Sequence, residues 1–135
     1  MFIDPETMQP YVPTPAYFLC GFDIYDREET LGEELEQYDP NDPADREVLI
    51  LKYCLPVSRT YQQKYLLFKC LEAALREEQY NFGTLFEYDH EAYSSFPAGW
   101  DEMENPRAFF EDIFRIITVE WEGDFQKARE GSSTW

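Results

Sequence analysis

The chain has 135 residues, enough for one domain with a buried core and too few for two independent domains. Aromatic residues make up 18% of it, which argues against general disorder. With 28 acidic and 11 basic residues the formal net charge is −17, so free nucleic acids and anionic membranes are repelled and basic proteins are attracted. We therefore expect residues 1–135 to form a single acidic binding domain.

The charge is unevenly spread along the chain. Residues 1–47 carry a net −11, residues 48–80 a net +2 and residues 81–135 a net −8. The middle segment therefore has the composition of a scaffold, and the flanking segments supply the negative field.

Prolines are frequent in the first 15 residues. Their fixed φ and missing amide hydrogens predict an extended, polyproline-like arm over residues 1–15 that lies over the domain. The aromatic run that follows, residues 16–25, has the composition of a short strand, although Gly21 interrupts it.

Two helices are predicted next. Thr30 and Glu33 have the spacing of a capping box, which predicts a short acidic amphipathic helix. Asp42 and Pro43 fit the N-cap and first position of a second helix over residues 43–55. Because that helix is apolar nearly all round, we expect it to be central.

The most regular predicted helix spans residues 58–80. Thr60 and Gln63 offer a second capping box. After it, five apolar residues recur on one helical face: Tyr61, Tyr65, Phe68, Leu71 and Leu75. We therefore predict that Leu71 is buried.

The last third begins with residues 81–104, which lack a sustained period and contain glycine and proline. We expect a long loop with a helical turn there. Asn105 and Pro106 then begin a helix to about residue 120, which Gly123 should stop. Residues 131–135 should form a frayed tail.

The predicted fold is mainly α: a single-domain helical bundle with an extended proline-rich N-terminal arm. Residues 116–121 are also a good strand sequence, rich in β-branched side chains. The alternative is therefore α+β, with a small sheet from residues 16–25 and 116–121.

The sequence offers little for catalysis. His90 is its one histidine, and no C-x-x-C pair or phosphate-binding glycine motif occurs, so we expect no enzyme, no metal and no organic cofactor. Cys20, Cys54 and Cys70 are widely spaced, which favours free, partly buried thiols. With no apolar signal core at the N-terminus, we expect a cytoplasmic protein.

Two groups of residues are candidates for binding a partner. The first is an acidic cluster whose carboxylate density rivals a phosphate backbone: Asp23, Asp26, Glu28, Glu29, Glu33, Glu34, Glu36 and Asp39. The second mixes aromatic and acidic residues, the composition of a binding hot spot: Glu87, Tyr88, Asp89, Glu91, Tyr93, Asp101 and Glu102. Solubility or salt adaptation is the alternative reason for the acidity, and packing onto the bundle is the expected role of Phe96 and Trp100.

In size and charge the chain is similar to bacterial immunity proteins and phage-encoded inhibitors, small acidic proteins whose targets are basic enzymes. The hypothesis is an inhibitor that blocks a basic macromolecular partner, most concretely an immunity protein that neutralises a cationic nuclease toxin. A nucleic-acid mimic that inhibits a DNA- or RNA-binding protein is the alternative. A small hydrolase is a second alternative, with carboxylates drawn from Glu47, Asp89, Glu111 and Asp112. We expect no direct contact with nucleic acid or membrane.

Overall fold

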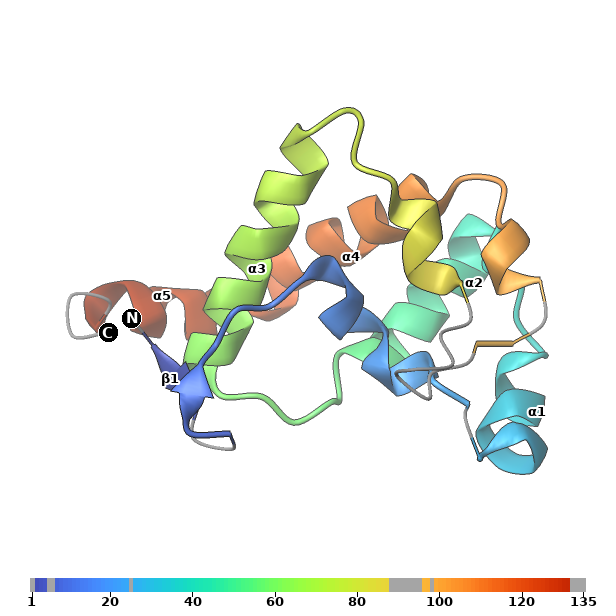
Figure 1. The fold of residues 1–135 in the computed structure, drawn as a ribbon, viewed down its shortest axis with the longest axis horizontal. Coiled ribbons are helices and arrows are strands. Elements are labelled where there is room, and N and C mark those ends of the chain that lie inside the picture. Colours follow the sequence, from blue (N-terminus) through green and yellow to red (C-terminus); the bar gives the residue numbers. More distant parts are fainter. Residues whose placement is uncertain (1, 5–6, 25, 88–95, 98, 132–135) are drawn as a thin grey trace.

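The computed structural model describes residues 2–4, 7–24, 26–87, 96–97 and 99–131, and it is mainly helical, as predicted. Within these ranges five α-helices and several short 3-10 and π-helical segments pack around one hydrophobic core (Figure 1). None of the helices in these ranges is both long and apolar enough to cross a bilayer.

The N-terminal arm is folded back on itself instead of being extended throughout. β1 (Ile3–Asp4) pairs antiparallel with β2 (Gln9–Pro10), and Ile3 lies opposite Pro10. This hairpin is the only sheet within the described ranges, so the alternative α+β sheet from residues 16–25 and 116–121 is wrong.

The aromatic run after the arm forms a 3-10 helix, η1 (Pro15–Phe22), and not a strand. Its Phe18 and Phe22 are fully buried. Gly21 explains the close packing, because a Cβ at that position would lie 2.0 Å from the carbonyl oxygen of Tyr53. η1 thus rests directly on the backbone of the helix that contains Tyr53.

The acidic helix begins before Thr30, and its first part is π-helical. It consists of a π-helical turn, η2 (Glu28–Gly32), followed by one turn of α-helix, α1 (Glu33–Leu35). The Thr30 hydroxyl donates to the Arg27 carbonyl at 3.3 Å and makes no side-chain cap, so the predicted first capping box is wrong. Leu35 is fully buried and holds this segment on the core.

The second helix begins as predicted. α2 (Pro43–Leu49) is capped by the Asp42 carboxylate, which accepts from the Asp45 amide, and it continues as a π-helical segment, η3 (Ile50–Cys54). Burial all round is not observed, because Val48 and Leu51 are 42% and 44% exposed. The helix contacts η1 and α4, and Val48 and Leu51 lie on its exposed side.

The regular helix is α3 (Tyr61–Arg76), and its capping box between Thr60 and Gln63 is confirmed. Leu71 is fully buried, as predicted. The helix ends four residues early, since Glu77 has an extended backbone.

The segment after α3 contains two 3-10 turns, η4 (Phe82–Phe86) and η5 (Trp100–Glu102). α4 (Pro106–Glu120) begins at the predicted Asn105 cap. Gly123 does not end a helix, because it lies within α5 (Glu122–Gly131). The break between α4 and α5 falls at Trp121. The predicted frayed tail lies outside the described residues after Gly131.

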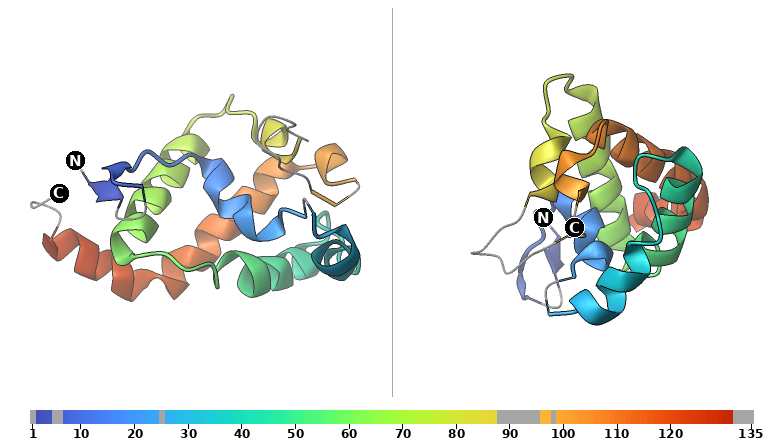
Figure 2. Two further views of the ribbon diagram at one scale, coloured as in Figure 1. Left: turned by 60° about the horizontal axis from the view of Figure 1, so that its bottom comes forward. Right: turned by 90° about the vertical axis from the view of Figure 1, so that its right-hand side faces the viewer.

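The core is rich in aromatic rings. Phe22, Phe86 and Trp100 pack around Phe109, with ring centroids 5.5 to 5.8 Å from it. Trp100 is 2% exposed and the half-buried Phe96 stacks on it, which confirms their predicted packing role. α3 packs against α5, α4 and η1, and η4 packs on α4 and η5 (Figure 2).

Candidate functional site

The first candidate group lies at one end of the elongated molecule. We define the acidic end as residues 23–24 and 26–47 together with residues 101–104, which meet on the right of Figure 1. Most of the first group is exposed there: Asp26, Glu28, Glu29, Glu33, Glu36 and Asp39. Asp23 and Glu34 are half-buried.

The second candidate group is only partly joined to the first. Asp101 and Glu102 are exposed on η5, and the backbone amide of the nearby Glu104 donates to Asn41 Oδ1 at 2.9 Å. Glu87 is exposed directly after η4. The remaining members lie outside the described residues, as does His90: Tyr88, Asp89, Glu91 and Tyr93.

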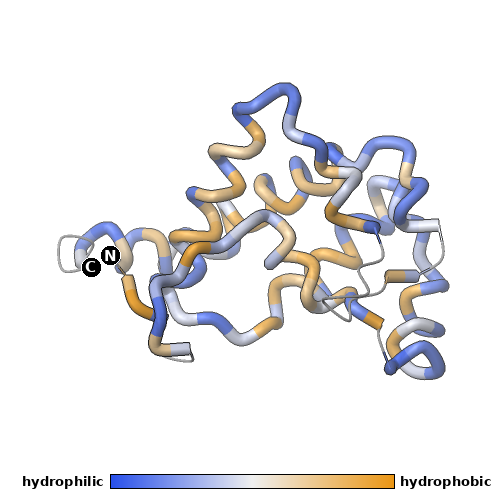
Figure 3. Tube along the Cα trace, in the orientation of Figure 1, coloured by the Kyte–Doolittle hydropathy of each residue, from blue (hydrophilic) through white to orange (hydrophobic). Residues whose placement is uncertain are grey.

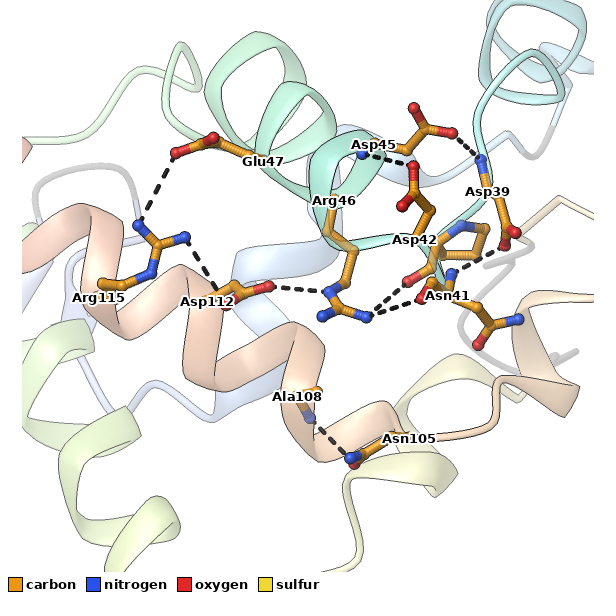
Figure 4. Close-up of polar contacts among 11 residues, drawn as sticks. Asp39, Asn41, Asp42, Asp45, Arg46, Glu47, Asn105, Ala108, Asp112 and Arg115 are labelled. Atoms are coloured by element: carbon orange, nitrogen blue, oxygen red, sulfur yellow. Dashed lines mark hydrogen bonds and ion pairs between the residues drawn. The ribbon is translucent and has the colours of Figure 1, made fainter.

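A buried arginine that the sequence analysis missed anchors the acidic end to the bundle. Arg46 on α2 is 9% exposed, and its Nε lies 2.8 Å from the Asp112 carboxylate on α4 (Figure 4). Its Nη1 donates to the carbonyl oxygens of Pro40 and Asn41 at 3.4 and 3.2 Å. One guanidinium therefore ties the turn before α2 to α4.

The turn that carries Asp39 and Asp42 is fixed by its own hydrogen bonds. The Asp39 amide donates to Asp45 Oδ2 at 2.9 Å, and the Asn41 amide donates to Asp39 Oδ1 at 2.9 Å (Figure 4). The Asp45 amide in turn donates to Asp42 Oδ2 at 3.4 Å. Asp39 and Asp42 remain exposed, so these carboxylates face water from a defined backbone.

The Glu34 carboxylate takes part in contacts within the protein. The Tyr53 hydroxyl donates to its carboxylate, and Lys52 Nζ lies 3.0 Å from the same oxygen. The hydrogen bond from Tyr53 and then the one from Lys52 hold the pKa of Glu34 below its ordinary value. Burial and the bond to Glu34 raise the pKa of Tyr53. This contact attaches α1 to η3.

The acidic end has few cations to offset its field. Residues 23–47 contain eleven carboxylates and two arginines, and Arg46 is buried. The other, Arg27, donates to the Asp23 carbonyl. In Figure 3 the tube around α1 is largely hydrophilic, whereas the centre of the molecule is hydrophobic. The structure thus concentrates negative charge at this end.

Two of the four carboxylates considered for a hydrolase, Glu47 and Asp112, are engaged in ion pairs. Arg115 lies 3.8 Å from Glu47 and 3.7 Å from Asp112, and Asp112 also pairs with Arg46. Glu111 is exposed on α4 and Asp89 lies outside the described residues. In the part of the chain that the structure describes, no three His, Cys, Asp or Glu side chains are grouped to hold a metal ion.

All three cysteines are free thiols, as predicted, but their exposure differs. Cys54 is buried, Cys70 is half-buried and Cys20 is exposed, so the expectation of partial burial fails for Cys20. Burial raises the pKa of the Cys54 thiol to about 12. Cys54 is therefore a core residue.

Comparison of the chain with protein-family models, with curated proteins and with solved structures finds no match. Any inference about function therefore rests on the residues of the site.

Proposed function

We propose that this chain is an acidic protein inhibitor that docks its acidic end onto the basic surface of a macromolecular partner. Its most concrete form is an immunity protein that fills the cationic cleft of a nuclease toxin with carboxylates. The observation that carries the proposal is the exposure of many carboxylates at one end, on a segment with only two arginines, one of them buried.

The contacts that hold the backbone of the acidic end in place support a binding role. Arg46 fixes the turn before α2, and the contact of Tyr53 with Glu34 fixes α1. A backbone that is already held in one conformation loses little conformational entropy on binding, which favours affinity. A nuclease is a suitable target because its cleft is arranged to hold closely spaced phosphates.

The proposal is tested by measuring the rate at which the chain associates with its partner. The partner is first captured from the source cell at low salt and identified by mass spectrometry. Replacing Glu29, Glu33 and Glu36 together with glutamine should slow association by about tenfold at low salt, because it weakens electrostatic steering. Glu34 is left in place because it attaches α1 to η3. The dissociation rate should change less.

The matched control neutralises three exposed glutamates of α4 and α5: Glu120, Glu122 and Glu130. It removes the same charge at a different place. If both triple variants slow association equally, the effect comes from net charge, and the acidic end is not the docking surface. If neither slows it, steering by these carboxylates is absent.

A further inference from the structure

The helical segment formed by α2 and η3 exposes apolar side chains on one side. Val48 is 42% exposed and Leu51 is 44% exposed. Leu49 and Ile50, which lie between them in the sequence, are fully buried. Residues three apart are neighbours on a helix surface, so Val48 and Leu51 lie next to each other. The segment therefore turns one apolar side to the core and a second one to water.

A third exposed apolar side chain lies on α4, which packs beside α2. Arg115 of α4 lies 3.8 Å from the Glu47 carboxylate of α2, so the sides of the helices that carry these residues face each other (Figure 4). Val119 follows Arg115 by one helical turn and is 70% exposed. We define the apolar patch as Val48, Leu51 and Val119.

The apolar patch adjoins the acidic end. Val48 directly follows Glu47, the last residue of the acidic end on α2. Lys52, directly after Leu51, lies 3.0 Å from the Glu34 carboxylate of α1. The patch is thus joined to the acidic end both by the continuous helix α2 and by an ion pair to α1.

The charged side chains beside the apolar patch suit a basic neighbour. In the described parts of this side of the molecule the cations next to the patch are Lys52 and Arg115, and both are paired with carboxylates. Glu111, one turn before Arg115, and Glu120, directly after Val119, are exposed. A basic partner therefore meets carboxylates around the patch, and the cations there are already paired.

This combination decides which occupant fits. Three partly exposed side chains are too few for a stable interface, which covers about 800 Å² on each partner, so an occupant also covers the neighbouring carboxylates. An uncharged occupant would take water from these carboxylates without pairing them, which costs free energy. A second copy placed there by two-fold symmetry would bring together two segments 23–47, each with eleven carboxylates and two arginines. A partner with apolar side chains beside basic ones avoids both costs.

We propose that the basic partner of the acidic end also covers the apolar patch, with apolar side chains that lie directly beside its basic ones, as on a basic amphipathic helix. The carboxylates steer encounter and surround the contact, and Val48, Leu51 and Val119 form its apolar part. This inference rests on the proposed function and adds to it the composition of the partner's surface.

Two synthetic helical peptides of equal length and charge test the proposal. One carries lysines on one face and leucines on the other, and the second has glutamine in place of every leucine. Isothermal titration calorimetry at physiological salt should give the lysine–leucine peptide a dissociation constant at least about tenfold lower, because its leucines bury apolar area on the patch. Neutralising Glu29, Glu33 and Glu36 with glutamine should weaken both peptides by a similar factor, since both carry the same charge.

Replacing Val48 and Leu51 together with alanine removes apolar area without changing charge. This variant should lose most of the preference for the lysine–leucine peptide, while its affinity for the lysine–glutamine peptide stays within about twofold of the wild type. Val119→Ala, on the other helix, should reduce the preference by about twofold to threefold. Far-UV circular dichroism checks that each variant stays folded.

The matched control replaces Ile3 and Val12 with alanine. They are 45% and 71% exposed on the N-terminal arm, at the end of the molecule opposite α1 (Figure 1), and this variant should keep the full preference. Equal binding of the two peptides to the wild-type chain overturns the inference and leaves the proposed function standing. A preference that the Val48 and Leu51 variant retains, or that the control loses equally, also overturns it. If neither peptide binds, the proposed function fails as well.

Discussion

Replacing Arg46 with methionine tests whether one buried guanidinium holds the acidic end on the bundle. The change removes the ion pair with Asp112 at 2.8 Å and the hydrogen bonds to the Pro40 and Asn41 carbonyl oxygens. Breaking a fully buried ion pair costs about 3–5 kcal/mol. Here the Asp112 side chain is 21% exposed and retains Arg115 as a partner, so we expect a loss of about 2–4 kcal/mol.

Urea unfolding followed by circular dichroism measures that loss as a change in the free energy of unfolding. Arg115→Met is the control, because the Arg115 side chain is 59% exposed and its ion pairs are longer, and it should cost less than about 1 kcal/mol. A double-mutant cycle with Asp112→Asn should give a coupling of about 1–3 kcal/mol. A loss for Arg46→Met no larger than that of the control would refute the role given to the guanidinium.

Two further predictions concern stability. Leu71→Ala should lower the free energy of unfolding by about 2–5 kcal/mol, because Leu71 is fully buried on α3; a loss below about 0.5 kcal/mol in urea unfolding would place it on the surface. Tyr53→Phe should weaken the pH dependence of stability. The folded-state pKa of Glu34 lies below its ordinary value of 4.5, so its contribution is present above that pH and is lost as pH falls through the folded pKa. Between about pH 6 and pH 3 the variant should therefore lose less stability than the wild type, and equal losses would contradict this account.

A local sequence signal predicted an element correctly only where the tertiary packing of that segment favoured the same element. Thr60 with Gln63 and Thr30 with Glu33 have the same spacing, yet only the first pair forms a capping box. A long amphipathic run follows Thr60. The residues around Thr30 instead form a π-helical turn in which the Gly32 amide donates to the Arg27 carbonyl at 3.0 Å. Spacing alone does not distinguish these cases.

The sequence alone did not predict the contacts between segments that are distant along the chain. The partner of Arg46 is 66 residues away on α4, so its anchoring role depends on a helix pairing that local patterns do not specify. The one local signal was an arginine between Asp45 and Glu47 in an otherwise acidic segment. Gly21 weakened the strand expectation correctly, but its contact with the Tyr53 backbone appears only in the fold.

The sequence predicted which residue types make up the candidate surface, but it only partly predicted where those residues lie in the fold. The acidic residues of the first group gather at one end because the buried Leu35 of α1 holds η2 and α1 on the core. Glu34 differs from its neighbours, since its bonds to Tyr53 and Lys52 depend on η3 lying beside α1. An exposed carboxylate and a structural one look alike in the sequence.

The crowding of carboxylates at the acidic end gives salt two opposite effects on this molecule. Like charges held close together oppose the compact state, and dissolved ions reduce that opposition by screening them. The same ions weaken the long-range attraction that would draw a basic partner. Added salt should therefore make the folded chain more stable while it makes encounter with a cationic target slower. A buffer that preserves the protein best during purification is for this reason a poor one in which to search for what it binds.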